Sequence, residues 1–446
     1  MDRGSAGCEH SGFASCPVIV QTMKKHTNPL GFLRLVVALT ISAVPVSSSG
    51  QSLQTVHPES AGFSSTGLDA VTTNLQQHID EGNIAGVVAA VARDGKLVYF
   101  EALGGLDIEQ QKPMPKEALF RIYSMTREIT STAVLQLYEA GKFKLDDPIQ
   151  KYLPEFSRQR VLMDPDSTDV SLSRTRSGDI EVAHLLTHTS GLGSRSSTLY
   201  REQQVRDKNY SLDEMITKAA TVPLFHDPGT AFRYGIHETI LGKLIEVWSG
   251  MPLDVYLKHN IFDPLAMNST VFWADGKDAD RLAGLYRPIE GQLTPHRIEV
   301  VPWSSRPRLL EGGVGLLSSV GDFLRFSQMI LNKGELDGHR ILSEDTARLI
   351  YENAVPDQAM PIGERGYWAG SGWTLGGFNL VMDPSAYSFP VSAGTIWWDG
   401  SAGTRYFIDS TQGVITVIMA QVSPSSGGGF REDFTSLVDA ALIERR

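Results

Sequence analysis

Apolar and polar positions follow two different periods along this chain of 446 residues. Between residues 63 and 82 the apolar positions recur every three or four residues, which predicts an amphipathic helix. The apolar face of that helix consists of Leu68, Val71, Leu75 and Ile79. Two short apolar runs then flank the turn Arg93-Asp94-Gly95-Lys96, and this pattern predicts a β-hairpin over residues 84–104.

The second half of the chain ends as it begins, with strands beside a helix. Three apolar runs, at 394–399, 403–409 and 414–421, are separated by short turns and are expected to pair as an antiparallel meander. A final helix is expected at 431–444, and the middle of the chain is mostly helical. The pattern predicts an α+β fold, in which an antiparallel sheet flanked by N- and C-terminal helices receives an inserted, mainly helical domain. The sheet domain would comprise residues 51–115 and 335–446, and the helical domain residues 116–334.

The N-terminus has the order of a secretory signal. A basic segment that opens at Met23-Lys24-Lys25 is followed by the apolar run 35–44 and then by small residues up to Gly50. The apolar run is too short for a stable membrane span. We therefore predict an upstream extension at 1–22, a signal peptide at 23–50 beginning at Met23, and a secreted or periplasmic protein.

Charge and cysteine content narrow the function further. The formal net charge is −11, which argues against nucleic acid as a main partner. Both cysteines, Cys8 and Cys16, lie in the predicted extension. A mature chain without them would have no disulfide, no thiolate nucleophile and no Cys-ligated metal.

A serine near the start of a helix is the first candidate for chemistry. The stretch from Phe120 leads to Ser124, after which a helical run continues to a predicted end at Gly141. The N-terminus of a helix offers free N–H groups and a positive dipole end, which suit a developing oxyanion. Taken alone, however, this stretch favours an ordinary N-cap at Ser124 over a nucleophile, because such caps are common.

Two further segments of the helical region carry candidate side chains. His184 and His188 are four residues apart, so both could ligate zinc from one helix face, but no nearby third ligand stands out. Tyr234 precedes a helix predicted at 238–248. A tyrosine in that position commonly serves packing, with its hydroxyl on a polar neighbour.

Seven segments together resemble the serine β-lactamase and penicillin-binding-protein superfamily, and most closely the class C-like family VIII carboxylesterases. No Gly-x-Ser-x-Gly elbow occurs, which disfavours an α/β-hydrolase. The matching segments, spread over residues 60–445, are Tyr123-Ser124-Met125-Thr126-Arg127, Leu145-Asp146-Asp147-Pro148-Ile149, His184 through Leu192, Pro228 through Tyr234, Leu241-Gly242, Gly312 through Leu316, and Trp398 through Thr404.

The resemblance implies acyl transfer with no cofactor and no metal. Ser124 would be the acylated nucleophile and Tyr234 its partner in proton transfer. Trp398-Asp399-Gly400 would replace the family's Lys-Thr-Gly strand and contact substrate. The backbone N–H groups of Ser124 and Ser401 would form the oxyanion hole. The same resemblance makes His184 and His188 parts of a structural motif.

Two departures from the family pattern affect the chemistry. Arg127 stands where the family has a lysine, and a guanidinium stays protonated, so Arg127 cannot be the base. Arg127 could still favour a Tyr234 phenolate, which leaves Tyr234 as the base. Asp399 would oppose an oxyanion unless it is paired, for example with Arg405. Without the Lys-Thr-Gly lysine, neutral esters are favoured over penicillins.

Three functions therefore remain open. The first is a serine hydrolase of small ester or amide substrates with weak or no β-lactamase activity. The others are a catalytically impaired binding protein, suggested by Arg127, and an acyltransferase to an acceptor other than water. The oligomeric state is not fixed by the sequence. Five aromatic residues could line an acyl pocket or simply pack in the core: Trp303, Tyr367, Trp368, Trp373 and Trp397.

Overall fold

The computed structural model of the protein describes residues 53–297 and 303–446. The predicted extension and signal peptide lie outside these residues. Within the described part, no helix is both long enough and apolar enough to cross a membrane.

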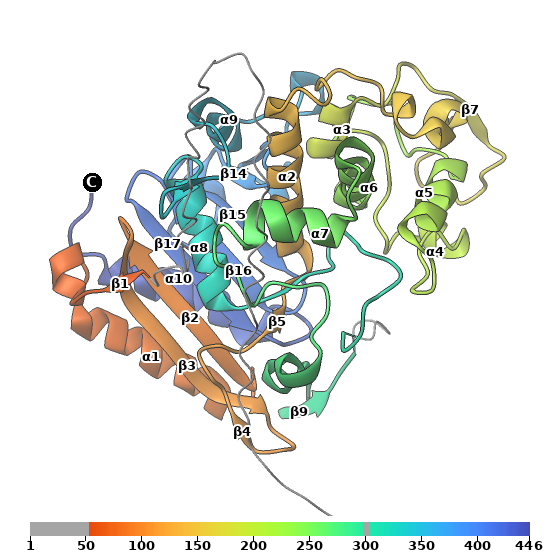
Figure 1. The fold of residues 1–446 in the computed structure, drawn as a ribbon. Coiled ribbons are helices and arrows are strands. Elements are labelled where there is room, and N and C mark those ends of the chain that lie inside the picture. Colours follow the sequence, from red (N-terminus) through yellow and green to blue (C-terminus); the bar gives the residue numbers. More distant parts are fainter. Residues whose placement is uncertain (1–52, 298–302) are drawn as a thin grey trace, which may run out of the picture. The chain divides into compact units, whose positions relative to one another are not determined.

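Strands from both ends of the described chain form one nine-stranded sheet (Figure 1). The strands are antiparallel except for the parallel pair of β1 with β3. Their order is β1 (Gln54–Thr55), β3 (Lys96–Asp107), β2 (Gly86–Arg93), β17 (Val414–Ala420), β16 (Thr404–Asp409), β15 (Ile396–Gly400), β14 (Asn379–Val381) and β13 (Ser371–Trp373), with β4 (Lys112–Pro113) paired to β3. The predicted hairpin and the C-terminal meander are both confirmed, and β17 joins them by pairing with β2.

The helices are largely those that the apolar periodicity predicts, with additions in the middle of the chain. They are α1 (Ser65–Asp80), α2 (Arg127–Glu139), α3 (Val182–Leu186), α4 (Thr198–Glu202), α5 (Leu212–Thr221), α6 (His237–Ser249), α7 (Leu253–Leu257), α8 (Val320–Leu331), α9 (Glu344–Arg348) and α10 (Phe430–Ala441). Two-stranded pairs complete the connections: β5 (Phe120–Arg121) with β10 (Leu317–Ser318), β6 (Arg160–Leu162) with β7 (Ser173–Thr175), β8 (Tyr286–Ile289) with β9 (Gln292–Pro295), and β11 (Glu335–Leu336) with β12 (His339–Arg340).

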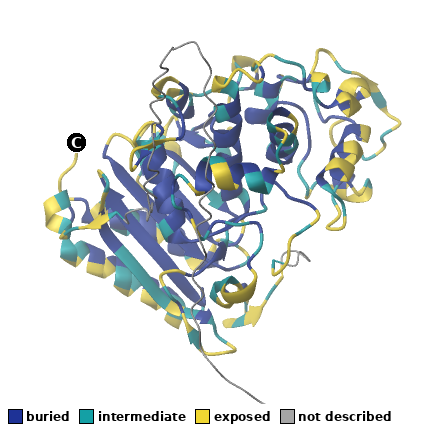
Figure 2. Ribbon diagram, in the orientation of Figure 1, coloured by how far each residue is buried: buried dark blue, intermediate teal, exposed yellow. Residues whose placement is uncertain are grey.

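The sheet separates two hydrophobic cores because its side chains alternate between faces. On one face, Trp398 and Tyr406 belong to the core that also contains the buried residues of α2, α6 and α8. On the other face, Ile418 and Phe434 belong to the core formed with α1 and α10, which pack together. The central strands β2, β16 and β17 are accordingly almost entirely buried, whereas α1 keeps an exposed outer side (Figure 2).

This architecture confirms the predicted α+β fold, with helices inserted between the two parts of the sheet. The inserted region includes α8, which packs on β17 and β2 and so covers the sheet directly. The exact domain boundaries at 115/116 and 334/335 stay a prediction.

Candidate active site

Ser124 lies in a 3-10 turn, Tyr123–Thr126, that runs directly into α2. The N-cap residues of the turn and of α2 are Ile122 and Thr126, and neither side chain makes a capping hydrogen bond. Ser124 is therefore not the helix cap that the sequence left open. Every other residue from 122 to 135 is buried, whereas Ser124 is half-buried and can be reached from outside.

The backbone around Ser124 is held in an uncommon conformation. Tyr123 has a φ of 42°, in the left-handed region that a bulky residue rarely adopts. Neighbouring segments fix this geometry, because the Ile122 amide donates to the Leu316 carbonyl at 3.1 Å and the Leu316 amide donates to Thr126 Oγ1 at 3.2 Å. The pairing of β5 with β10 extends the same anchor on the N-terminal side.

Tyr234 meets Ser124 from the loop before α6. The Ser124 side chain is among the neighbours that lower the Tyr234 pKa, and the Trp398 indole N–H donates to the Tyr234 hydroxyl at 3.0 Å. Burial nevertheless outweighs these contacts and raises the pKa of Tyr234 above its ordinary value. The structure thus brings together the predicted serine, tyrosine and Trp398.

Arg127 occupies the space beneath the Tyr234 ring. Its guanidinium carbon lies 4.1 Å from the ring centroid, a cation–π contact, and its charge lowers the Tyr234 pKa. Burial lowers the pKa of Arg127 itself, but a guanidinium remains protonated in proteins. A permanent positive charge therefore faces the phenol.

A buried acidic residue, Glu238, balances that charge. Glu238 Oε2 accepts a hydrogen bond from Arg127, and Glu238 Oε1 lies 3.0 Å from His188 Nε2. His188 Nδ1 is in turn 2.8 Å from Nδ1 of His237. Burial holds the pKa values of both histidines well below the usual range, so both rings are neutral and one Nδ1 donates to the other.

Glu128 is a second buried carboxyl beside the site. Burial raises its pKa to about 8, so the carboxyl is mostly protonated at neutral pH. The hydroxyl of Tyr406 on β16 is close enough to lower the Glu128 pKa, but burial outweighs this effect. Sequence reasoning did not single out Glu128.

Strand β15 approaches the serine turn closely enough to require glycine. A Cβ at Gly400 would lie 2.5 Å from the Ile122 carbonyl oxygen and 2.3 Å from Thr404 Oγ1. Beyond this contact the chain turns, and Ser401 is exposed while Ala402 is buried. Gly400 thus sets the spacing between the Ser124 turn and the backbone of Ser401.

Asp399 is neutralised by two arginines, one of which the sequence suggested. Its Oδ2 accepts from Arg405 on β16 and from Arg431 on α10, each at 3.1 Å. Its Oδ1 accepts from the Tyr367 hydroxyl at 2.9 Å. The carboxylate is therefore satisfied by cations and does not stand unpaired beside the serine.

The five aromatic residues take different places. Trp368 and Trp373 surround Tyr234 with Trp398, at ring-centroid separations of 5.7, 5.8 and 5.2 Å from the phenol. Trp397 is buried on the opposite face of β15, stacked on Phe407. Tyr367 is 46% exposed, and Trp303 packs against Tyr123. Trp373 and Trp397 are thus core residues, whereas Trp303 and Trp368 are half-buried and Tyr367 is exposed.

The two histidines of the possible zinc motif have separate partners. His184 Nδ1 accepts from the Glu181 amide at 3.1 Å and completes a capping box at the start of α3. His188 instead contacts His237 and Glu238. Both contacts are of the structural kind that the resemblance implied.

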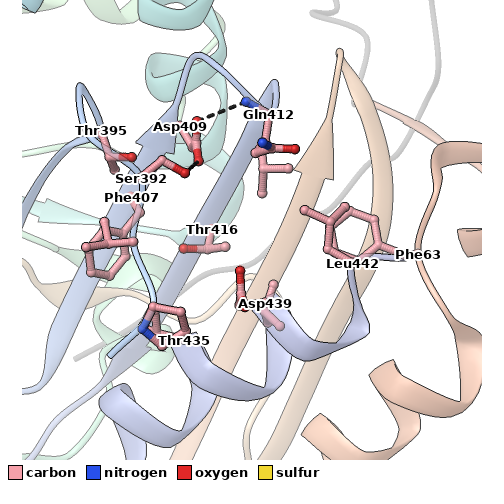
Figure 3. Close-up of a pocket in the computed structure, with 14 residues that line it drawn as sticks. Phe63, Ser392, Thr395, Phe407, Asp409, Gln412, Thr416, Thr435, Asp439 and Leu442 are labelled. Carbon is pink, nitrogen blue, oxygen red and sulfur yellow. Dashed lines mark hydrogen bonds between the residues drawn. The ribbon is translucent and has the colours of Figure 1, made fainter. Parts of the chain in front are cut away.

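A separate cavity of about 70 Å³ lies on the far side of the sheet, between β16, β17 and α10 (Figure 3). Phe407, Thr416, Thr435 and Leu442 line it, and Ser392 and the Gln412 amide donate to Asp409 at its rim. None of the predicted site residues contributes to this cavity.

Comparison with known proteins identifies the family. The Beta-lactamase family model matches residues 71–440. The chain belongs to the β-lactamase family. It is 32% identical to the esterase EstB of Burkholderia gladioli over 80% of this chain and 90% of that protein. It is 28% identical to the acyltransferase mokF of Monascus pilosus over 67% and 75% of the two chains.

Solved structures agree with this assignment. The chain superposes on EstCE1, described as a hydrolase with promiscuous acyltransferase activity, with a TM-score of 0.73 and 27% identity. The match covers 84% of this chain and 98% of EstCE1. The proteins that this chain resembles are thus named as an esterase, as an acyltransferase and as a hydrolase with promiscuous acyltransferase activity.

The β-lactamase resemblance did not reveal Glu238 and its histidines. One signal was available, because Glu238 follows Tyr234 by four residues and a buried arginine requires a nearby carboxylate. That requirement could have directed attention to the start of α6.

Proposed function

We propose that the protein is a serine hydrolase that cleaves carboxylic esters through an acyl-enzyme on Ser124. The observation that carries the proposal is the contact of Ser124 with Tyr234, whose ring lies over the Arg127 guanidinium. The similarity to EstB supports the esterase class. We further propose that the chain is exported through the segment that begins at Met23.

The steps follow from the positions of these groups. Ser124 Oγ attacks the ester carbonyl and its proton passes to the Tyr234 oxygen, while the backbone N–H groups of Ser124 and Ser401 hold the oxyanion. The phenolate that accepts the proton is stabilised by Arg127 and by the Trp398 N–H. Tyr234 then protonates the departing alcohol, and water releases the acyl group by the reverse path.

Arginine in place of lysine changes where the proton can go. A lysine can exchange a proton with its neighbours, but Arg127 can supply only a fixed charge. Because burial raises the Tyr234 pKa, the base form becomes more abundant towards alkaline pH. We therefore expect esterase activity to rise with pH and β-lactamase activity to be weak or absent.

The test is hydrolysis of p-nitrophenyl butyrate by the wild type, Ser124→Ala, Tyr234→Phe and Arg127→Lys, from pH 6 to 10, with spontaneous hydrolysis subtracted. Ser124→Ala should lose activity, and Tyr234→Phe should lower kcat by roughly 10²–10⁴-fold and remove the alkaline rise. Intact-mass spectra should show an acylated wild type and an unmodified Ser124→Ala variant. A rate independent of pH down to 6 would contradict Tyr234 as base.

The Arg127→Lys variant tests whether the site is adapted to an arginine at this position or is impaired by it. A gain in kcat would mean that the arginine limits an otherwise complete site, whereas a loss would mean that the surroundings are adapted to a guanidinium. Absence of both turnover and acylation in the wild type and in Arg127→Lys would favour the alternative, a catalytically impaired binding protein.

Acyl transfer is a second candidate, favoured by the similarity to mokF and EstCE1. In this case an alcohol attacks the acyl-enzyme in place of water. Adding an alcohol acceptor to the same assay should then convert part of the acid product into a new ester, which chromatography detects.

A further inference from the structure

A basic cavity lies beside the serine turn, and Trp303 is the one site residue discussed above that lines it. Its volume is about 200 Å³. Four of its lining residues are cationic, Arg206, Lys208, Arg306 and Arg308, whereas Glu311 is its one acidic lining residue among those described. This excess of positive charge is unexpected in a chain whose formal net charge is −11.

The described acidic residues around the cavity pair with its three arginines but not with Lys208. Arg206 Nε binds both Glu311 oxygens at 2.8 and 2.9 Å. Arg306 pairs with Asp254 at 2.9 Å, and Arg308 reaches Glu214 at 3.3 Å.

Lys208 is exposed at the cavity, and no described carboxylate is within ion-pairing distance of it. The neighbouring Asp207 is not among the residues that line the cavity. Its Oδ1 instead accepts a hydrogen bond from the Asn209 amide at 2.8 Å. One positive charge therefore remains at the cavity without a described counter-charge, next to two arginines held by exposed pairs.

The inner wall of the cavity is apolar and adjoins the catalytic turn. Phe272, Trp303 and Val314 line it, and Trp303 and Val314 also pack against Tyr123, the residue before Ser124.

The backbone that carries Val314 is fixed to α2 behind the site. Thr130 Oγ1 donates to the Gly312 carbonyl at 2.7 Å, and a Cβ at Gly313 would lie 3.6 Å from the Arg127 guanidinium. The chain segment 312–314 thus contacts both the basic cavity and the residues around Ser124.

We propose that this cavity is a substrate subsite for a carboxylate, so that the preferred substrates are esters whose acyl chain ends in an anionic group. The apolar wall would hold the chain, and Lys208 with Arg308 would hold the carboxylate. The inference rests on the proposed esterase function, because it places the ester carbonyl at Ser124.

The test compares p-nitrophenyl hemiesters of succinic, glutaric and adipic acid with neutral p-nitrophenyl esters of matched length. The wild type should show a higher kcat/KM for at least one hemiester, despite the negative charge of the protein. Lys208→Met and Arg308→Met should each reduce the hemiester-to-neutral ratio by roughly fivefold, the upper range for an exposed charge pair. Added salt should shrink the preference in the wild type.

Lys142→Met is the matched control, since Lys142 is an exposed lysine beyond the C-terminal end of α2. It should leave both activities unchanged. Hydrolysis of neutral esters that depends on Ser124 but shows no hemiester preference would overturn the subsite and leave the proposed function intact.

A binding measurement keeps the subsite testable if the wild type cleaves neither class of ester. Ser124→Ala is titrated calorimetrically with the hemiester and with its neutral counterpart. The proposal requires tighter binding of the hemiester, weakened by adding Lys208→Met. Equal affinity for the two ligands would refute it, whatever the outcome for catalysis.

Discussion

Arg127 is the residue on which the proposed chemistry depends, and its partners explain how a guanidinium is accommodated there. The side chain is buried, faces the Tyr234 ring and is held by Glu238 from the first turn of α6. Breaking a buried ion pair by removing one partner is costly because it leaves an unpaired charge. We therefore infer that Glu238 positions Arg127 and partly offsets its positive charge, which weakens the effect of that charge on the Tyr234 pKa.

Replacing Glu238 should show how far its charge offsets that of Arg127. In Glu238→Gln the amide oxygen can still accept from Arg127, but the guanidinium charge is no longer offset, so the pKa of Tyr234 should fall. The alkaline rise of kcat/KM for p-nitrophenyl butyrate should move to lower pH, and unfolding in urea should show a loss of about 3 kcal/mol.

Glu246→Gln is the control for this prediction, because Glu246 lies on the same helix and pairs with Lys243 at 3.2 Å away from the phenol. Its pH profile should match the wild type. If Glu238→Gln is destabilised but its profile does not move, Glu238 has a structural role only.

At the scale of elements, the site depends on the contact between β15 and the turn before α2. These two elements come from opposite ends of the chain, and Gly400 allows their backbones to meet. The Ser124 and Ser401 amides are proposed to share one oxyanion, so their separation must be set closely.

Gly400→Ala should therefore impair catalysis more than folding. The added methyl group would meet the Ile122 carbonyl and force β15 away from the serine turn. We expect kcat to fall by roughly 10²-fold, the effect of a displacement of about 1 Å. Circular dichroism should still show a folded protein.

Gly321→Ala on α8 provides the comparison. The nearest atom to a Cβ at Gly321 is Ser319 Oγ, 3.9 Å away. This variant should retain kcat and gain roughly 0.5–1 kcal/mol of stability from helix propensity. An unchanged kcat in Gly400→Ala would show that the close approach is not needed for catalysis.

The elements themselves were largely predictable from local pattern. The hairpin, the meander and the terminal helices differ from their predicted bounds by a few residues. Local periodicity reports the face that each element buries, and alternation on β15 already places Trp397 and Trp398 on opposite sides of the sheet.

The partners of Arg127 were not predictable in the same way. Glu238 is 111 residues from Arg127, and the pairing of His188 with His237 spans 49 residues. Such contacts depend on how α2, α3 and α6 pack together. The periodicity of apolar residues within one helix carries no information about that packing. The resemblance predicted that Ser124 and Tyr234 lie together, as they do in the structure, because a family motif carries spatial information. The family has a lysine at position 127, so the resemblance did not indicate which residues surround an arginine there.

For the whole molecule, buried groups at the centre of the fold couple stability to pH in opposite directions. His188 and His237 have pKa values well below normal in the folded protein. At acidic pH these two histidines are therefore protonated in the unfolded chain but stay neutral in the folded state. They reduce stability as pH falls through about 6.5. Glu128 behaves in the opposite way, because its folded pKa of about 8 lies above the ordinary value of 4.5.

Glu128→Gln isolates the second effect. Between pH 4.5 and 8 the folded state retains the Glu128 proton that the unfolded chain releases, so wild-type stability falls as pH rises across this interval. An amide cannot ionise, and the variant should lack this loss. The free energy of unfolding of Glu128→Gln relative to the wild type should therefore increase by about 2–3 kcal/mol between pH 6 and 8.

Urea unfolding of both proteins at pH 6, 7 and 8 measures this difference, and differences between variants cancel the contributions of the other titrating groups. Glu202→Gln, an exposed position on α4, should track the wild type at all three values. A difference that stays constant with pH would mean that Glu128 is already ionised in the folded protein. The carboxylate would then lie beside Arg127 as a second counter-charge, and Tyr234 would face a weaker positive field than its contact with the guanidinium implies.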